Sequence, residues 1–492
     1  MQLRPDPIVT PEDLERGKKA LVQDAAWATL AGALYGGVIL VGFALELGAS
    51  ASIIGILAAI PFLAQLSQLG AMVLVERVRE RRKIVVLAVS ASRALILCLA
   101  LIPFIPDRSL QLTALVGAQI AIALLGSIAG CALNSWLHQI VPRESLGALF
   151  SRRLFWSTVL AALGALSAGY LVQHWPGAEK THAYSIAFVL AGAAGFVSSH
   201  FLTRVPEPPM PENSGRVPLL ELLRTPFQDV DFRGVIIFMA SWNFASNIAA
   251  PFITVYLLRQ MGYELGTVTT LWMVGQVATA LTLYLWGRLS DRLSNKAILS
   301  VALPAYFAGL VGLSFTALPA PHALTLPLLY LIHIIMGAAS GGIGLATGNL
   351  GLKLAPQGQG TAYLTAVGLS GSLAAGLAAL AGGGLADWFA ARELSITFHW
   401  ISPGDMKQLT LLQFRHWEFL FGISFAIGFY VMHRLSRIRE GEEHSERTVV
   451  QQFVIEAVRS LDQISPIEGL RTVVLFPFGR LRERRLKPRS PT

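Results

Sequence analysis

The chain has 492 residues, of which 53% are hydrophobic and 14% charged, and its formal net charge is +9. In soluble domains roughly a quarter of the residues are charged. This composition therefore excludes an ordinary soluble protein and predicts a polytopic membrane protein. The excess positive charge lies in connections and in the C-terminal tail, so it requires no nucleic-acid partner.

Twelve apolar segments follow one another along the chain, each long enough to cross roughly 30 Å of hydrocarbon as a helix. They lie near residues 25–45, 52–75, 84–105, 112–138, 154–173, 184–203, 233–257, 266–288, 298–318, 325–352, 361–385 and 417–437. Since a helix satisfies its own backbone hydrogen bonds in lipid, the predicted fold is an all-α polytopic membrane protein with twelve transmembrane helices.

Landmarks in these segments recur at an offset of 214 or 215 residues. Gly48 matches Gly262, Pro142 matches Pro356, and Glu76-Arg77 is matched by the charged sequence around Asp291. This offset predicts two six-helix repeats, which is typical of transporters that bind their substrate between repeats. The predicted divisions are 1–24 (N-terminus), 25–203 (first repeat), 204–232 (linker), 233–437 (second repeat) and 438–492 (basic tail).

The basic residues predict the orientation. Of the 39 Lys and Arg residues, 32 fall on one side of the predicted spans and 6 on the other, and Arg93 lies within a span. Positive charge marks the cytoplasmic side, so both termini are expected there. The first span has no small-residue cleavage site and is expected to insert uncleaved. The absence of an Asn-x-Ser/Thr sequon is compatible with a bacterial inner membrane.

Three connecting regions carry signals of their own. Residues 217–224 predict a short interfacial helix in the linker. The external connection 386–416 is long enough to cap the mouth of the bundle, although a simple packed loop is an alternative. The tail is expected to lie on an anionic leaflet or, alternatively, to bind a partner protein.

A loop motif repeats after the second and eighth spans. The later copy has Gly287, Asp291, Arg292 and Lys296, and the earlier copy has Glu76, Arg77, Arg81, Arg82 and Lys83. With its twelve spans, the chain resembles the major facilitator superfamily up to about residue 440. The earlier copy departs from that family's motif at Met72 and Glu76, and the later copy at Ser294.

A carboxylate at a helix end can meet a helix N-terminus or an arginine and form a latch. Glu76, Arg77, Gly287, Asp291 and Arg292 are therefore predicted to form a conformational gate on the cytoplasmic side. The alternative is a charged loop that only obeys the positive-inside rule.

Polar side chains inside the spans are candidates for a substrate cavity. The resemblance implies that spans one, four, seven and ten line this cavity. Amides and indoles suit neutral polar or amphipathic solutes, and the alternative role of each is an interhelical hydrogen bond. The candidates are Gln65, Arg93, Gln119, Asn134, Asn243, Asn247, Trp272, Gln276, His333 and Asn349.

Charged groups in the spans are few. Arg93 is costly in lipid, by roughly 2.5 kcal/mol or more, so it either serves function or pins helices together. Coupling to protons would depend on Asp24 or His333. Cys98 and Cys131 are expected to be buried apolar residues rather than a disulfide or metal pair.

The sequence contains no phosphate-binding loop, no His-Glu-x-x-His and no nucleophile turn. We therefore expect no enzyme activity, cofactor or metal. The sequence predicts a secondary active or facilitative transporter of a small organic solute, with or without a coupling proton or ion, that works by alternating access in the bilayer. The alternatives are a non-transporting sensor or assembly factor that uses its tail, or a lipid flippase.

Overall fold

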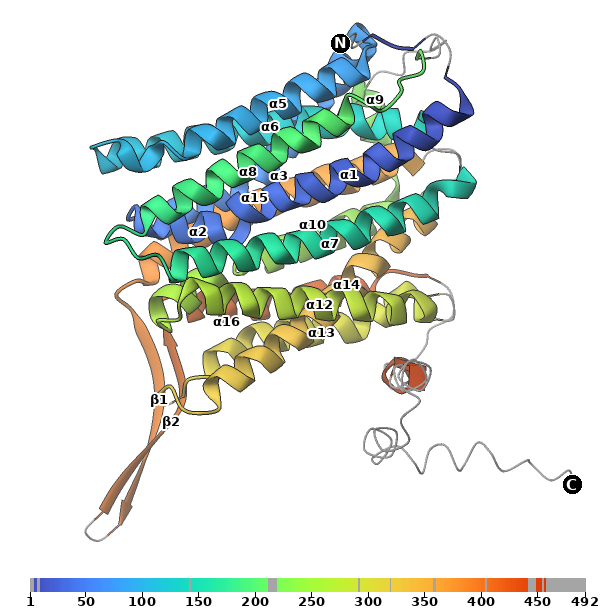
Figure 1. The fold of residues 1–492 in the computed structure, drawn as a ribbon. Coiled ribbons are helices and arrows are strands. Elements are labelled where there is room, and N and C mark those ends of the chain that lie inside the picture. The colour runs from blue at the N-terminus through green and yellow to red at the C-terminus, as the bar shows by residue number, and fades with distance from the viewer. Residues whose placement is uncertain are drawn as a thin grey trace, which may run out of the picture.

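The computed structural model describes residues 4–6, 9–140, 143–210, 219–290, 293–318, 320–356, 360–402, 405–440, 448–453 and 455–456 (Figure 1). The gate residues Asp291 and Arg292, the repeat landmark Pro142 and the tail from residue 457 onward lie outside this described part.

Long helices build the molecule, and they run side by side in one bundle (Figure 1). The first half contains α1 (Pro11–Tyr35), α2 (Gly37–Glu46), α3 (Ala51–Ala64), η1 (Gln65–Ser67), α4 (Gln68–Val78), α5 (Arg81–Leu99), η2 (Ile102–Phe104), α6 (Arg108–Ile140), α7 (Arg143–Gln173) and α8 (Thr181–Leu202). The linker contains α9 (Leu219–Gln228), which agrees with the short helix expected there.

The second half repeats this order and adds a pair of strands before its last helix. It contains α10 (Val230–Asn247), α11 (Ala250–Val255), η3 (Tyr256–Gln260), α12 (Leu265–Ser290), α13 (Asn295–Gly312), η4 (Leu313–Phe315), α14 (Thr325–Leu354), α15 (Gly360–Phe389), β1 (Glu393–Ser402), β2 (Asp405–Arg415) and α16 (Glu418–Ser436).

Eleven helical segments of the described chain are long and apolar enough to cross a membrane. The third predicted span, α5, falls outside that set because its 19 residues include four basic ones, Arg81, Arg82, Lys83 and Arg93. It nevertheless packs lengthwise against α6 and α8 within the bundle (Figure 1). The predicted all-α membrane fold is thus confirmed.

The internal repeat is visible in the backbone. Gly48 and Gly262 both adopt positive φ, +84° and +69°, directly before the helix that begins the next span. The first and seventh spans are also interrupted at equivalent places: α1 gives way to α2 at Gly36, and α10 to α11 before Pro251. In the second half the break accompanies Pro251, since proline cannot continue the hydrogen-bond ladder of a helix. In the first half it falls at Gly36 and Gly37, where Gly37 adopts a φ of +53°. Each half thus begins with a broken helix.

The first helix starts earlier than its apolar segment. Thr10 and Asp13 form a capping box at the start of α1, and their reciprocal hydrogen bonds fix the helix N-terminus at Pro11. The segment 11–24, expected as an N-terminal extension, is therefore helical and continuous with the first span.

The connection 386–416, expected to cap the bundle or to pack as a loop, contains an antiparallel β-hairpin. It projects from the ends of α15 and α16 and crosses the direction of the helices (Figure 1). We call this end of the bundle the hairpin end. The opposite end, where α1 begins and residues 203–210 run, is the linker end.

Candidate functional site

Two helix crossings join the halves near the hairpin end. A β-carbon added at Gly55 of α3 would lie 2.5 Å from the carbonyl oxygen of Ala379 on α15, and one at Gly383 would lie 2.7 Å from the Ala51 carbonyl oxygen. A β-carbon at Gly169 of α7 would lie 2.4 Å from Thr269 Oγ1 on α12. Glycine is therefore what allows both crossings to be so close.

The two crossings are the same contact repeated by the duplication. Adding 214 to Gly55 gives Thr269, and adding 214 to Gly169 gives Gly383. The structure therefore extends the repeat from single landmarks to a pair of matching contacts between the halves.

A polar latch accompanies each crossing. The carboxylate of Asp387 on α15 accepts hydrogen bonds from the backbone N–H groups of Ala51 (3.0 Å) and Ser52 (2.9 Å) and from Ser52 Oγ (2.5 Å). It thus caps the N-terminus of α3 from the other half. Its counterpart Gln173 packs its side chain against Gly266 at the start of α12. The sequence analysis missed both latch residues, although the offset of 214 relates them.

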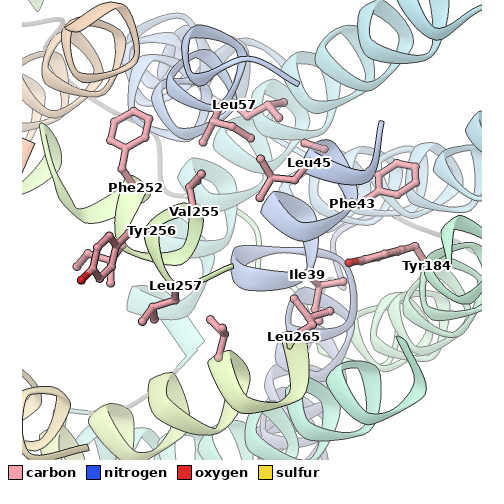
Figure 2. Close-up of a cluster of buried hydrophobic side chains, with 14 of the residues drawn as sticks. Ile39, Phe43, Leu45, Leu57, Tyr184, Phe252, Val255, Tyr256, Leu257 and Leu265 are labelled. Atoms are coloured by element: carbon pink, nitrogen blue, oxygen red, sulfur yellow. The ribbon is translucent and has the colours of Figure 1, made fainter. Parts of the chain in front are cut away.

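A buried apolar cluster seals the same end. It brings Phe43 and Leu57 of the first half together with Phe252, Tyr256 and Leu265 of the second half (Figure 2). At the linker end the buried clusters are separate: one contains first-half residues such as Trp136, and the other contains second-half residues such as Trp286, with Phe453 packed against it. Continuous packing between the halves is therefore concentrated at the hairpin end.

A cavity of about 460 Å³ lies in the seam beside the hairpin root. Both halves line it, through Ser50 and Ala51 on one side and Arg259, Asp387 and His416 on the other. Burial lowers the pKa of His416, and the nearby Asp387 opposes that shift.

At the linker end, the first half is closed on itself by a buried carboxylate. Glu207 accepts hydrogen bonds from the backbone N–H of Arg81 (2.6 Å) and of Arg82 (3.1 Å), and Arg81 Nε lies 3.4 Å from it. Trp136 Nε1 donates to the Pro206 carbonyl oxygen (3.0 Å), which fixes the start of the linker on α6. We call this arrangement the first clamp.

The second half has an equivalent clamp. Glu440, which follows α16, accepts hydrogen bonds from Asn295 Nδ2 and from the backbone N–H of Lys296, both at 2.6 Å, and its carboxylate lies 3.3 Å from Lys353 Nζ. Arg81 and Asn295 are 214 residues apart. In each half, therefore, a carboxylate after the last long helix caps the helix of the third span.

Three of the predicted gate residues, Glu76, Arg77 and Gly287, lie at this same end. Glu76 and Arg77 are exposed on α4, and Gly287 lies near the end of α12, where a β-carbon would meet no atom within 4 Å. Next to Gly287, Arg288 Nη1 donates to Glu456 of the tail (2.6 Å), so a tail segment covers the end of α12. With Asp291 and Arg292 outside the described residues, the gate stays a prediction.

Two predicted cavity residues meet between helices of the second half. Trp272 on α12 donates from Nε1 to Thr254 Oγ1 on α11 (3.1 Å), and its ring lies edge-on to His333 of α14 at 6.1 Å. His333 is buried and its Nδ1 lies 2.8 Å from the Leu329 carbonyl oxygen. Gln276 follows Trp272 by one turn and is exposed.

The side-chain amides of Asn243 and Asn247 on α10 form hydrogen bonds within their own helix. Asn243 Nδ2 donates to the Met239 carbonyl oxygen and Asn247 Nδ2 to the Asn243 carbonyl oxygen, both at 2.9 Å. Asn349 belongs to the linker end instead, where its Nδ2 donates to Ser290 Oγ (3.0 Å) beside the second clamp.

The remaining first-half amides are scattered. Gln65 accepts a hydrogen bond from Gln68 within the same short stretch of the second span. On α6, Gln119 is buried with no hydrogen-bond partner for Nε2 among the described residues, whereas Asn134 is exposed. The structure thus does not gather all the predicted cavity residues in one place.

Asp24 and Arg93 belong to one polar cluster in the first half. The buried Asp24 accepts a hydrogen bond from Ser198 Oγ on α8 (2.7 Å), and Arg153 and Arg93 are the cationic groups that act on it. The Arg93 stem packs on Gly195 of α8, where an added β-carbon would lie 2.3 Å from its Cδ. Arg93 therefore has a packing role between α5 and α8, whatever else it does.

Comparison with known proteins agrees with this architecture. The family model described as Major Facilitator Superfamily matches residues 25–379. No curated protein sequence matches the chain.

Solved structures with the same fold share few residues with the chain. A nucleoside transporter, NupG (D323A mutant), superposes with a TM-score of 0.63 at 13% identity, covering 86% of this chain and 100% of its own. A D-xylose-proton symporter gives 0.63 at 13%, covering 87% and 98%. A bacterial homolog of the human lysosomal transporter Spinster, in an inward-facing and unoccupied conformation, gives 0.57 at 18%, covering 78% and 84%.

These likenesses establish the fold, and the family model covers well over half of the sequence. The chain belongs to the major facilitator superfamily, a family of non-enzymatic membrane transporters.

Proposed function

We propose that the chain carries a small organic solute across the membrane by alternating access, with its two halves rocking about a central site. The observation that supports this most is the asymmetry of packing. One buried cluster joins the halves at the hairpin end, whereas each half keeps its own cluster at the linker end. Such a distribution is expected when one gate is closed and the other open.

The gates then have distinct parts. The outer gate consists of the two glycine crossings with Asp387 and Gln173. The two clamps hold each half rigid at the linker end. Glu76, Arg77, Gly287, Asp291 and Arg292 would come together there when the linker end closes.

We place the linker end in the cytoplasm of a bacterial inner-membrane protein. The support is the excess of Lys and Arg on that side of the spans. Both termini then face the cytoplasm, and the hairpin lies on the opposite face.

The face of α12 that carries Trp272 and Gln276 is our candidate for substrate contact. Trp272 is already held by Thr254, so its ring is preorganised for stacking, and the exposed Gln276 can both donate and accept hydrogen bonds. This chemistry suits a neutral polar or amphipathic solute. Asp24 and His333 remain the two candidates for a coupling proton.

The test is ligand-dependent unfolding followed by transport. The purified protein is heated with libraries of sugars, nucleosides, amino acids and organic acids at neutral and mildly acidic pH. A ligand at about 100 times its Kd should add roughly 2.7 kcal/mol of stability. The hit is then followed by uptake into proteoliposomes. We expect Gln276→Ala to abolish the stabilisation and Val277→Ala, the next residue on α12, to retain it.

The two alternatives predict other results. A lipid flippase would ignore water-soluble ligands and move labelled phospholipid between leaflets. A sensor or assembly factor would bind without transporting, and deletion of the tail would remove its activity in cells while the bundle still folded. Ligand binding without uptake would therefore contradict the transport proposal.

A further inference from the structure

The β-hairpin has one apolar face and one polar face. In the register of the two strands, Leu394 pairs with Phe414 and Ile396 with Leu412, whereas Ser395 pairs with Gln413 and Thr397 with Thr410. Successive side chains of a strand point to opposite faces. Leu394, Ile396, Phe398 and Trp400 of β1 therefore share a face, and Ser395, Thr397 and His399 share the other.

This apolar face is uncovered by the described part of the chain. Leu394, Ile396, Phe398 and Trp400 are 49%, 48%, 58% and 72% exposed. Near the tip, Ile401 and Met406 are exposed as well, and they pair with each other on the opposite face. Toward the tip the two faces are less distinct, because in the register of the apolar face Lys407 is paired with Trp400 and Asp405 with Ser402, while Ile401 and Met406 lie on the other face. Large exposed apolar surfaces of this kind mark interaction sites.

The root of the hairpin fixes the direction in which the apolar face points. Phe414, on that face, packs against α16, where a β-carbon added at Gly422 would lie 3.0 Å from its ring. Gly422 is one turn inside α16, which begins at Glu418. The apolar face at the root is therefore turned along the helices, toward the hydrophobic part of the bundle.

Aromatic residues continue this surface onto the helix ends. Phe419 of α16 lies 6.0 Å from Phe414 and stacks on Phe389 of α15 at 4.2 Å between ring centroids. The exposed Trp388 lies beneath the Arg392 guanidinium, 3.8 Å from the ring centroid. Aromatic and basic side chains in this arrangement are typical of the boundary between hydrocarbon and headgroups.

We propose that the β-hairpin lies on the bilayer at the hairpin end of the bundle, with Leu394, Ile396, Phe398 and Trp400 in the lipid and its polar face in water. Three observations favour lipid over a protein partner: the direction of the face at Phe414, its continuity with the aromatic residues of α15 and α16, and the projection of the hairpin across the helix direction (Figure 1). The proposal requires only that the bundle spans a membrane, not which end is cytoplasmic.

Spin labels on neighbouring residues test it. In a Cys98→Ala/Cys131→Ala background, which removes both free thiols, Phe398→Cys and His399→Cys are labelled separately and the protein is placed in phospholipid nanodiscs. We expect the label at 398 to collide mainly with oxygen, which concentrates in lipid, and the label at 399 mainly with a water-soluble nickel chelate. Leu394→Cys and Ser395→Cys should repeat the alternation nearer the root.

Equal access of the nickel chelate to both faces would overturn the proposal, because the hairpin would then be in solution. A different result would be that neither oxygen nor the nickel chelate collides with the label at 398, while labels on two copies show dipolar broadening. A second copy of the chain would then cover the apolar face, and the proposal would be overturned as well.

A second set of variants separates anchoring from folding. Phe398→Asn/Trp400→Asn should release the hairpin, so that a label at Ile396→Cys becomes accessible to the nickel chelate, while Thr397→Asn/His399→Asn should leave that label in lipid. Size-exclusion elution and thermal unfolding should be the same for both pairs, because Phe398 and Trp400 are exposed and the contact with α16 is made by Phe414 at the root. If the label at 396 responds equally to both pairs, lipid does not hold the hairpin.

Discussion

At the residue scale, each half has a buried carboxylate after its last long helix. This carboxylate accepts hydrogen bonds at the N-terminus of the third span of the same half, α5 or α13. Glu207 serves the first half and Glu440 the second. A carboxylate at a helix N-terminus is favoured by the unpaired N–H groups and the helix dipole. Arg81 is buried beside Glu207, so the first clamp is an ion pair whose partners depend on each other.

Removing the Glu207 carboxylate is expected to destabilise the first half strongly. Glu207→Ala leaves the buried Arg81 guanidinium without its counter-charge, and breaking such a pair costs about 3–5 kcal/mol. The measurement is thermal unfolding in detergent. Glu80→Ala is the matched control, since Glu80 forms a solvent-accessible pair with Lys83 (2.8 Å), and exposed pairs contribute little to stability. Equal losses in both variants would contradict the role of the clamp.

The pH dependence of the same group has a definite sign. Burial raises the pKa of Glu207, against the lowering by the Arg82 and Arg81 backbone N–H groups and the Arg81 charge. A carboxyl whose pKa is higher in the folded state holds more protons there than in the unfolded state. The free energy of unfolding therefore decreases as the pH rises from the ordinary carboxyl pKa through the raised pKa of the folded state. The unfolding temperature of the wild type minus that of Glu207→Gln should fall over that window, and a rise would show that the shift has the opposite sign.

At the element scale, α3 with α15 and α7 with α12 form the two crossings that close the hairpin end. In both, a glycine lets backbones approach to distances that a β-carbon would forbid. The glycines at these crossings are therefore sensitive to a single added methyl group, whereas Gly384, the next residue on α15, has room for one.

Gly383→Ala should open the hairpin end. Its β-carbon would lie 2.7 Å from the Ala51 carbonyl oxygen, a backbone atom of α3, so the helices must separate. Gly384→Ala is the matched control, because no atom lies within 4 Å of its added β-carbon. Labelling of Ser50→Cys, in the seam, by a membrane-impermeant maleimide should be faster in Gly383→Ala than in Gly384→Ala. Equal labelling rates would mean that this crossing does not set the outer gate.

The β-hairpin was predictable from the sequence but was not predicted. Residues 394–400 alternate apolar and polar with a period of two, and Pro403-Gly404 follows, which is typical of a strand and a turn. The prediction for this connection rested on its length and on its tryptophans and histidine, not on this alternation. By contrast, Asp387 gives no local signal, because the N–H groups that it caps are more than 330 residues away in the other half.

At the scale of the whole molecule, alternating access requires the hairpin end to open and close. Gln173 and Gly266 provide a way to lock it, because a β-carbon at Gly266 would lie 3.8 Å from Gln173 Cβ, the usual separation in a disulfide. In the Cys98→Ala/Cys131→Ala background, Gln173→Cys/Gly266→Cys should cross-link the halves on oxidation and stop transport, and a reductant should restore it.

Each cysteine alone is the control for that experiment and should transport under oxidising and reducing conditions alike. Transport at the full rate by the cross-linked pair would mean that the halves do not separate at this end, and alternating access through it would be wrong.

The sequence by itself determined the membrane class, the order of the long apolar segments and the duplication. These depend on local apolar length and on a repeat offset, both of which can be read without contacts. Only the tertiary structure showed that the two halves pack together at the hairpin end, and that Glu207 and Glu440 each cap the third long helix of their half. It also showed that Asn349 lies at the linker end and not beside Trp272. The reason is that helix packing brings together residues from different spans, and no periodicity within one span records its partner in another.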